Sequence, residues 1–211
     1  MARQLKAVFV YLDNTLHDDS VERYQAAVRR TCERFADREG SPQTERLMEA
    51  YLKRSQEYWS NARNERGLRW SEITQKLWYE AFADCGSNER TKPNAMTEVL
   101  FHECVRGFRL FPDAQQTLID LGTSRVVAIS GELGSAKPSV EIFEEAVRRA
   151  GVASHQAAHV GDSLETDVAG AKTAGMLAIW LNRKKLEPEL HAPQPDHQIA
   201  SLREVAALLL Q

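Results

Sequence analysis

The sequence has no long apolar segment, no paired-cysteine motif and no excess of either charge. No apolar run approaches the roughly 18–20 residues that span a bilayer, and the run of about six near residue 7 is too short for a signal-peptide core. Cys32, Cys85 and Cys104 form an odd set without a CxxC pair, which favours reduced thiols in a cytoplasmic protein. The net charge is −3, which argues against nucleic acid or a membrane as a partner.

Hydrophobic periodicity divides the 211 residues into three parts. Residues 6–12 form an apolar run typical of a buried strand, whereas residues 18–108 hold several helical patterns and no convincing strand. Beyond residue 112 strands and helices alternate. Further strands are expected at 125–130, 157–160, 177–181 and 198–200. We therefore predict an α/β fold: a Rossmann-like parallel-sheet core domain of residues 1–17 and 109–211, with an inserted all-helical cap domain of residues 18–108.

Polar residues follow the predicted strands where ligands bind in parallel sheets. Asp13 follows the first strand, Lys137 lies in the loop after strand 125–130, and Asp162 and Asp167 follow strand 157–160. Each residue alone is typical of a turn, a solvated loop or a helix cap. Together they place carboxylates and a cation at one sheet edge, which indicates a magnesium and phosphate site.

The motifs around these residues resemble those of the haloacid dehalogenase (HAD)-like hydrolase superfamily, in its helical-cap phosphatase type. The resemblance covers essentially the whole chain and is most specific in the block that contains Asp162 and Asp167. The matching segments, in chain order, are LDNTLHD, LFPDAQQTL, SGELGSAKP, HVGDSLETDVAGAKTAGM and IWLNR.

The resemblance implies Mg²⁺-dependent phosphomonoester hydrolysis through an aspartyl phosphate. In this sequence Asp13 would be the general acid/base, Lys137 would balance charge, and Thr15 and Lys137 would bind the substrate phosphate. The implied metal ligands are the backbone carbonyl of Asp13 and the carboxylates of Asp162 and Asp167.

Tyr11 departs from the family pattern because it occupies the position of the nucleophilic aspartate. A carboxylate is ionised at neutral pH, whereas a phenol has an ordinary pKa of about 10. The longer side chain also removes a metal ligand and places a ring in the space of the phosphoryl group. We therefore expect no nucleophilic function from Tyr11 and only weak Mg²⁺ binding.

The second departure is a missing segment before strand 125–130. The family has another strand there, with a phosphate-binding Ser or Thr and a crossover helix, but this chain has only residues 122–124 between its predicted helix and that strand. A parallel crossover needs about a dozen residues. The sheet is therefore expected to lack one strand, through either a natural deletion or a truncated sequence.

These departures leave the enzymatic status open. The family activity is expected to be lost or very weak, with a small phosphorylated metabolite as substrate if the chain is active. The alternatives are a non-catalytic binding or scaffold protein on the same fold, and a phosphatase with Asp13 as nucleophile and Thr15 two residues on. An unpaired sheet edge favours a homodimer over a robust monomer.

Overall fold

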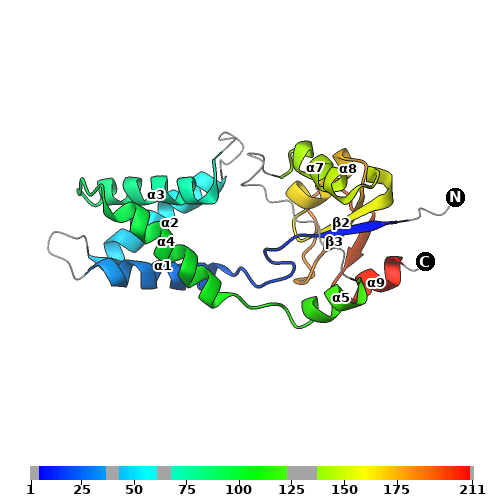
Figure 1. The fold of residues 1–211 in the computed structure, drawn as a ribbon, viewed down its shortest axis with the longest axis horizontal. Helices are drawn as coiled ribbons and strands as arrows, with labels where there is room; N and C mark the ends of the chain where they lie inside the picture. Colours follow the sequence, from blue (N-terminus) through cyan, green and yellow to red (C-terminus); the bar gives the residue numbers. More distant parts are fainter. Residues whose placement is uncertain (1–4, 37–42, 61–67, 123–136, 210–211) are drawn as a thin grey trace. The chain divides into compact units, whose positions relative to one another are not determined.

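The chain forms two compact units in a computed structural model that describes residues 5–36, 43–60, 68–122 and 137–209 (Figure 1). The core unit consists of Met1–Asp18 and Arg109–Gln211, and the cap unit consists of Asp19–Phe108. Each unit has its own hydrophobic core. In the described part of the chain, no helix combines the length and the apolar character needed to cross a membrane.

Within the described residues, four parallel strands form the sheet of the core unit, in the order β1-β2-β3-β4. The strands are β1 (Ala7–Val10), β2 (Ala157–Gly161), β3 (Leu177–Leu181) and β4 (His197–Ile199). Their parallel pairing confirms the predicted α/β fold and brings the ends of β1 and β2 to one edge of the sheet. The predicted strand at 125–130 and the expected missing segment lie outside the described residues.

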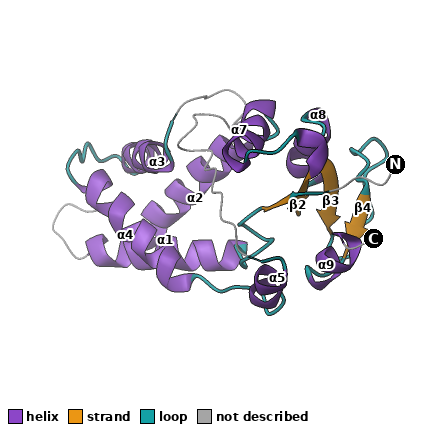
Figure 2. Cartoon of the chain, turned by 45° about the vertical axis from the view of Figure 1, so that its right-hand side comes forward, coloured by secondary structure: helices purple, strands orange, loops and turns teal. Residues whose placement is uncertain are grey.

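Helices cover both faces of this sheet (Figure 2). On one face α7 (Val140–Ala150) and α8 (Ala169–Thr173) pack against apolar side chains that include Ala178 and Trp180. On the other face α5 (Ala114–Asp120) and α9 (Arg203–Leu209) cover residues that include Ile179 and Leu181. Side chains of a strand alternate between its two faces, so β3 needs apolar residues at every position, and it has them.

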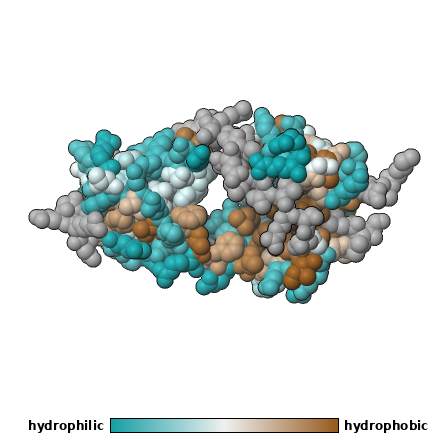
Figure 3. Space-filling view, in the orientation of Figure 1, coloured by the Kyte–Doolittle hydropathy of each residue, from teal (hydrophilic) through white to brown (hydrophobic). Residues whose placement is uncertain are grey.

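The described part of the cap unit is a bundle of four helices, α1 (Val21–Ala36), α2 (Thr44–Ser60), α3 (Trp70–Asp84) and α4 (Lys92–Gly107). Its core centres on Trp78, which is fully buried and stacks on Tyr51 with ring centroids 3.7 Å apart. In the view of Figure 3 this unit presents mostly hydrophilic residues, whereas hydrophobic residues gather over α5 of the core unit. Leu118 and Ile119 are exposed hydrophobic residues of α5.

A buried ion pair ties α5 to the end of β3. Arg183 donates from both terminal nitrogens to the two carboxylate oxygens of Asp113, at 2.9 Å each. The same carboxylate accepts from the Ser201 hydroxyl at 2.7 Å and from the Leu202 N–H at 2.9 Å. Burial raises the pKa of Asp113, but these hydrogen bonds and the Arg183 charge outweigh it and lower the pKa to about 2.

We expect Asp113 to make the stability of the core unit depend on acid pH. Its pKa is lower in the folded chain than the ordinary 3.8, so its contribution is complete above about pH 4 and is lost as pH falls towards 2. The full loss, below pH 2, should be roughly 2 kcal/mol, and about half of it should be present at pH 3. Urea denaturation gives the free energy of unfolding at pH 7 and at pH 3, and the difference between these two values should be smaller for Asp113→Asn than for the unmodified chain. Asp120→Asn, at an exposed carboxylate of the same helix, should keep the full difference; equal behaviour of the two variants would contradict the assignment.

Candidate functional site

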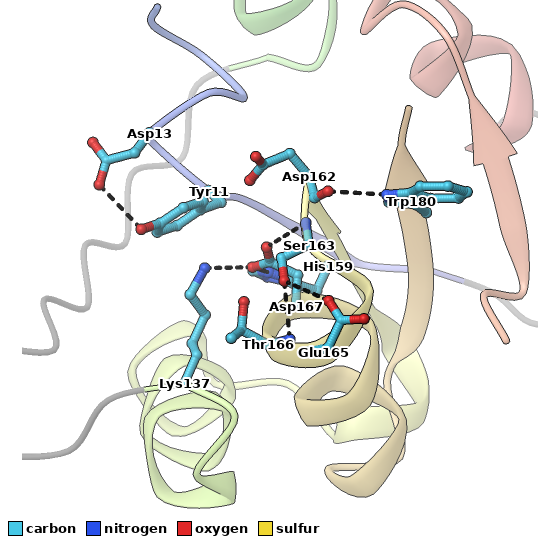
Figure 4. Close-up of polar contacts among 10 residues, drawn as sticks. All are labelled: Tyr11, Asp13, Lys137, His159, Asp162, Ser163, Glu165, Thr166, Asp167 and Trp180. Carbon is cyan, nitrogen blue, oxygen red and sulfur yellow. Dashed lines mark hydrogen bonds and ion pairs between the residues drawn. The ribbon is translucent and has the colours of Figure 1, made fainter. Parts of the chain in front are cut away.

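The site lies at the carboxyl ends of β1 and β2, where most of the sequence-predicted residues come together. Tyr11 and Asp13 follow β1, Asp162 follows β2, and Asp167 lies in the π-helical turn Leu164–Val168. Lys137 reaches the same place from the segment before α7 (Figure 4). Between Asp13 and Thr15 the chain turns through Asn14, whose φ of 51° is a left-handed conformation that asparagine tolerates.

Tyr11 is held as a neutral phenol. Its hydroxyl donates to Oδ2 of Asp13 at 3.0 Å, and the Lys137 ammonium lies over its ring, 2.8 Å from the centroid. Burial, and then the nearby Asp13 carboxylate, raise the pKa of Tyr11 far above its usual range. Oδ1 of Asp13 also lies 3.0 Å from Nε2 of His17. Tyr11 is therefore a hydrogen-bond donor to the carboxylate beside it.

Asp167 is a buried anchor for the Lys137 ammonium. Its Oδ1 lies 2.5 Å from Nζ of Lys137 and 2.8 Å from Nε2 of His159, and its Oδ2 accepts from the Ser163 N–H at 3.2 Å. Burial raises the pKa of Asp167, but the His159 hydrogen bond and the Lys137 charge outweigh burial and lower it. Burial lowers the pKa of Lys137, opposed by the charges of Asp167, Asp162 and Asp13.

Asp162 is the carboxylate that could hold a cation. Among the described residues it forms no ion pair, although its backbone oxygen accepts from Nε1 of Trp180 at 2.9 Å. Burial and then the Asp167 charge raise the pKa of Asp162 to about 6. A cation beside this carboxylate would lower the pKa of Asp162 again, because it would stabilise the ionised form.

These residues offer magnesium only a partial site. In the part of the chain that the structure describes, no group of three or more His, Cys, Asp or Glu is placed to hold a metal. Both Asp167 oxygens already accept from protein donors, so the Asp162 carboxylate and the Asp13 carbonyl would be the ligands. Mg²⁺ held by one or two carboxylates takes its remaining ligands from substrate and water. A bound ion would supply positive charge for a phosphate at this edge.

We expect calorimetric titration of the unmodified chain with MgCl₂ to show binding in the millimolar range or weaker, because position 11 provides no carboxylate. Tyr11→Asp should bind Mg²⁺ more tightly, and Asp162→Asn should remove the remaining binding. Tight, stoichiometric binding by the unmodified chain, or binding unaffected by Asp162→Asn, would contradict this description of the site.

Thr15 differs from the other predicted residues because its side chain is fully buried. Its hydroxyl has no hydrogen-bond partner among the described residues, and its backbone oxygen accepts from Arg183 at 2.9 Å. The predicted role of Thr15 in phosphate binding stays a prediction.

Sequence reasoning missed His159. Its ring is buried, contacts Asp167 and packs edge-to-face on Phe143 with ring centroids 5.1 Å apart. Strand periodicity provides a signal for this contact, because His159 and Gly161 are two residues apart in β2 and so face the same side. A Cβ added at Gly161 would overlap the Asp167 carboxylate. That face of β2 therefore contacts Asp167 at both positions.

Comparisons with known proteins agree with this architecture. Residues 135–205 match the HAD-hydrolase-like family model. The chain is 42% identical over 98 residues to phosphoserine phosphatase of Thermus thermophilus, covering 44% of this chain and 39% of that protein. It is also 28% identical to glyceraldehyde 3-phosphate phosphatase of Methanothermobacter thermautotrophicus, covering 88% of this chain and 89% of that protein. Several curated relatives, phosphoserine phosphatase among them, are matched over less than half of their own length.

Solved structures extend the similarity to the whole fold. A 2-haloacid dehalogenase from Pseudomonas syringae superposes with a TM-score of 0.72 at 27% identity, covering 98% of each chain. A HAD-hydrolase from Bacillus subtilis bound to magnesium superposes with a TM-score of 0.68 at 17% identity, covering 98% of this chain and 99% of that chain. The family model, the relatives and the shared fold agree. The chain has the α/β fold and the helical cap of HAD-like hydrolases, and residues 135–205 match their family model.

Proposed function

We propose that this chain is a HAD-like phosphatase by descent whose Mg²⁺-dependent hydrolysis of small phosphomonoesters is lost or very weak. The observation that carries the proposal is the state of Tyr11, a neutral phenol bonded to Asp13 beneath the Lys137 ammonium. A buried phenol whose pKa is raised is a poor nucleophile at neutral pH. The phosphatase names of several relatives support a phosphorylated metabolite as ligand.

The contacts of the Asp13 carboxylate are a second obstacle to hydrolysis. The carboxylate of Asp13 accepts from Tyr11 and contacts His17, so both of its oxygens are engaged. A general acid/base must reach the leaving-group oxygen directly or through one water. A carboxylate that is bonded to the residue at the nucleophile position is not free to do so. Loss of hydrolysis therefore follows from Tyr11 in two ways, through the missing nucleophile and through its hold on Asp13.

A direct assay tests this proposal. The unmodified chain, incubated with Mg²⁺ and a panel of phosphomonoesters that includes phosphoserine and glyceraldehyde 3-phosphate, should release phosphate no faster than Tyr11→Phe. Tyr11→Phe keeps the ring and removes the hydroxyl, so it isolates any chemistry of the phenol. Rapid release by the unmodified chain would overturn the proposal. If Asp13→Asn then abolished that release, Asp13 would take part in the reaction, as nucleophile or as general acid/base.

A non-catalytic role would use the same fold for binding. Lys137 and Asp162 place a cation and a carboxylate at the sheet edge without a nucleophile between them, which suits retention of a ligand rather than its turnover. The expected homodimer stays a prediction, which sedimentation equilibrium of the chain would test. The exposed Leu118 and Ile119 provide apolar surface for such self-association.

A further inference from the structure

One arginine of the core unit contacts both segments that connect it to the cap unit. Arg183 follows β3, and its Nη2 donates to the backbone oxygen of Thr15 at 2.9 Å, shortly before the chain enters the cap unit at Asp19. The same nitrogen and Nη1 bind the Asp113 carboxylate, shortly after the chain returns at Arg109. A single guanidinium thus bonds to residues that are almost a hundred positions apart in the sequence.

The two connecting segments also bond to each other. The Asp18 N–H donates to the Arg109 oxygen at 3.0 Å, and the Phe111 N–H donates to the Leu16 oxygen at 2.9 Å. The guanidinium of Arg183 stacks on the Phe111 ring, with its central carbon 4.1 Å from the ring centroid. The paired segments are therefore bound at one end to the sheet through Arg183.

We propose that Arg183 is a positioning residue that fixes the Asp13–Thr15 loop, together with segments 15–18 and 109–113, to the end of β3. The site loop and the connections to the cap unit then form one rigid element of the core unit. This role depends on the fold and not on turnover, so it does not rest on the proposed function.

The chemistry of the side chain explains why arginine suits this position. A guanidinium offers five N–H donors in a planar fork and stays charged at any pH at which the chain folds. It can therefore bind a carboxylate with two bonds and a carbonyl with a third. Lysine presents one ammonium and cannot reproduce the fork. Loss of Arg183 would leave the buried Asp113 carboxylate with only its neutral donors Ser201 and Leu202, and would remove the donor that Arg183 provides to the Thr15 carbonyl.

Hydrogen exchange measured by NMR tests this proposal through named amides. In Arg183→Met the amides of Asp18 and Phe111 should exchange about tenfold faster or more, relative to those of β2 and β3. Arg183→Lys should lie between Arg183→Met and the unmodified chain. Lys184→Met, at the exposed neighbouring residue, should leave both sets of amides unchanged.

The test depends on whether faster exchange is confined to the amides of Asp18 and Phe111. If the sheet amides accelerate by the same factor as Asp18 and Phe111, Arg183 only adds to the stability of the core unit and the proposal is wrong. If Arg183→Met fails to fold, Asp113→Asn weakens the two bonds from Arg183 to this side chain and should still give a smaller acceleration confined to the same two amides. Its absence would overturn the proposal. Phosphatase activity in the unmodified chain would contradict the proposed function and leave this exchange result standing.

Discussion

Replacing Tyr11 by aspartate should raise Mg²⁺-dependent phosphomonoester hydrolysis by at least roughly 10²-fold over the unmodified chain. The change supplies an ionised nucleophile, adds a metal ligand and frees Asp13 from the phenol hydroxyl that now bonds to it. Activity should still fall short of a complete site, because one absent oxyanion donor costs roughly 10²–10³ in rate. The segment that would carry such a donor is the one that this sequence is expected to lack. Phosphate release at saturating substrate, with and without Mg²⁺, measures both effects.

Tyr11→Asn is the matched control because asparagine has nearly the size of aspartate but no nucleophilic charge. It should remain inactive. If Tyr11→Asn gained as much activity as Tyr11→Asp, removal of the ring alone would be sufficient, and Asp13 would become the candidate nucleophile. If neither variant gained activity, the assignment of position 11 as the nucleophile position would fail.

Replacing Gly161 by alanine should destabilise the core unit by about 3 kcal/mol, near the upper end for overpacking. The added Cβ would overlap the Asp167 carboxylate, which is 1% exposed and cannot move without breaking its bonds to Lys137 and His159. The backbone of Gly161 is not left-handed, so close approach of Asp167, and not conformational freedom, requires glycine here. Urea denaturation followed by circular dichroism measures the free energy of unfolding.

Gly107→Ala provides the comparison, since a Cβ added at Gly107 would meet no atom within 4 Å. Gly107 lies in the last turn of α4, and alanine has a higher helix propensity than glycine. The free energy of unfolding of this variant should therefore be unchanged or slightly higher. Equal effects of the two substitutions would show that Asp167 can move aside at little cost. The bonds around Asp167 would then not be a rigid part of the site.

The sequence by itself determined the class of fold. Alternating strands and helices after residue 112 require a parallel sheet with two covered faces, since buried strands such as Leu177–Leu181 are apolar at every position. The same pattern predicts that residues after β1 and β2 meet at one edge, because parallel strands end on the same side. The sequence also shows a tyrosine at position 11, where the resemblance to the family motif predicts a nucleophilic aspartate.

Only the tertiary structure decided what the polar side chains bind. Arg183 and Asp113 are 70 positions apart, and nothing in local periodicity pairs them. The contact of His159 with Asp167 depends on how the turn after β2 folds back over Gly161, and so does the engagement of both Asp167 oxygens. Hydrogen bonds between distant residues depend on distances and angles that packing sets, whereas strand and helix patterns depend on neighbours in the chain. The hydrogen bond from Tyr11 to Asp13 joins residues only two positions apart, but it too depends on side-chain positions that strand and helix patterns do not give.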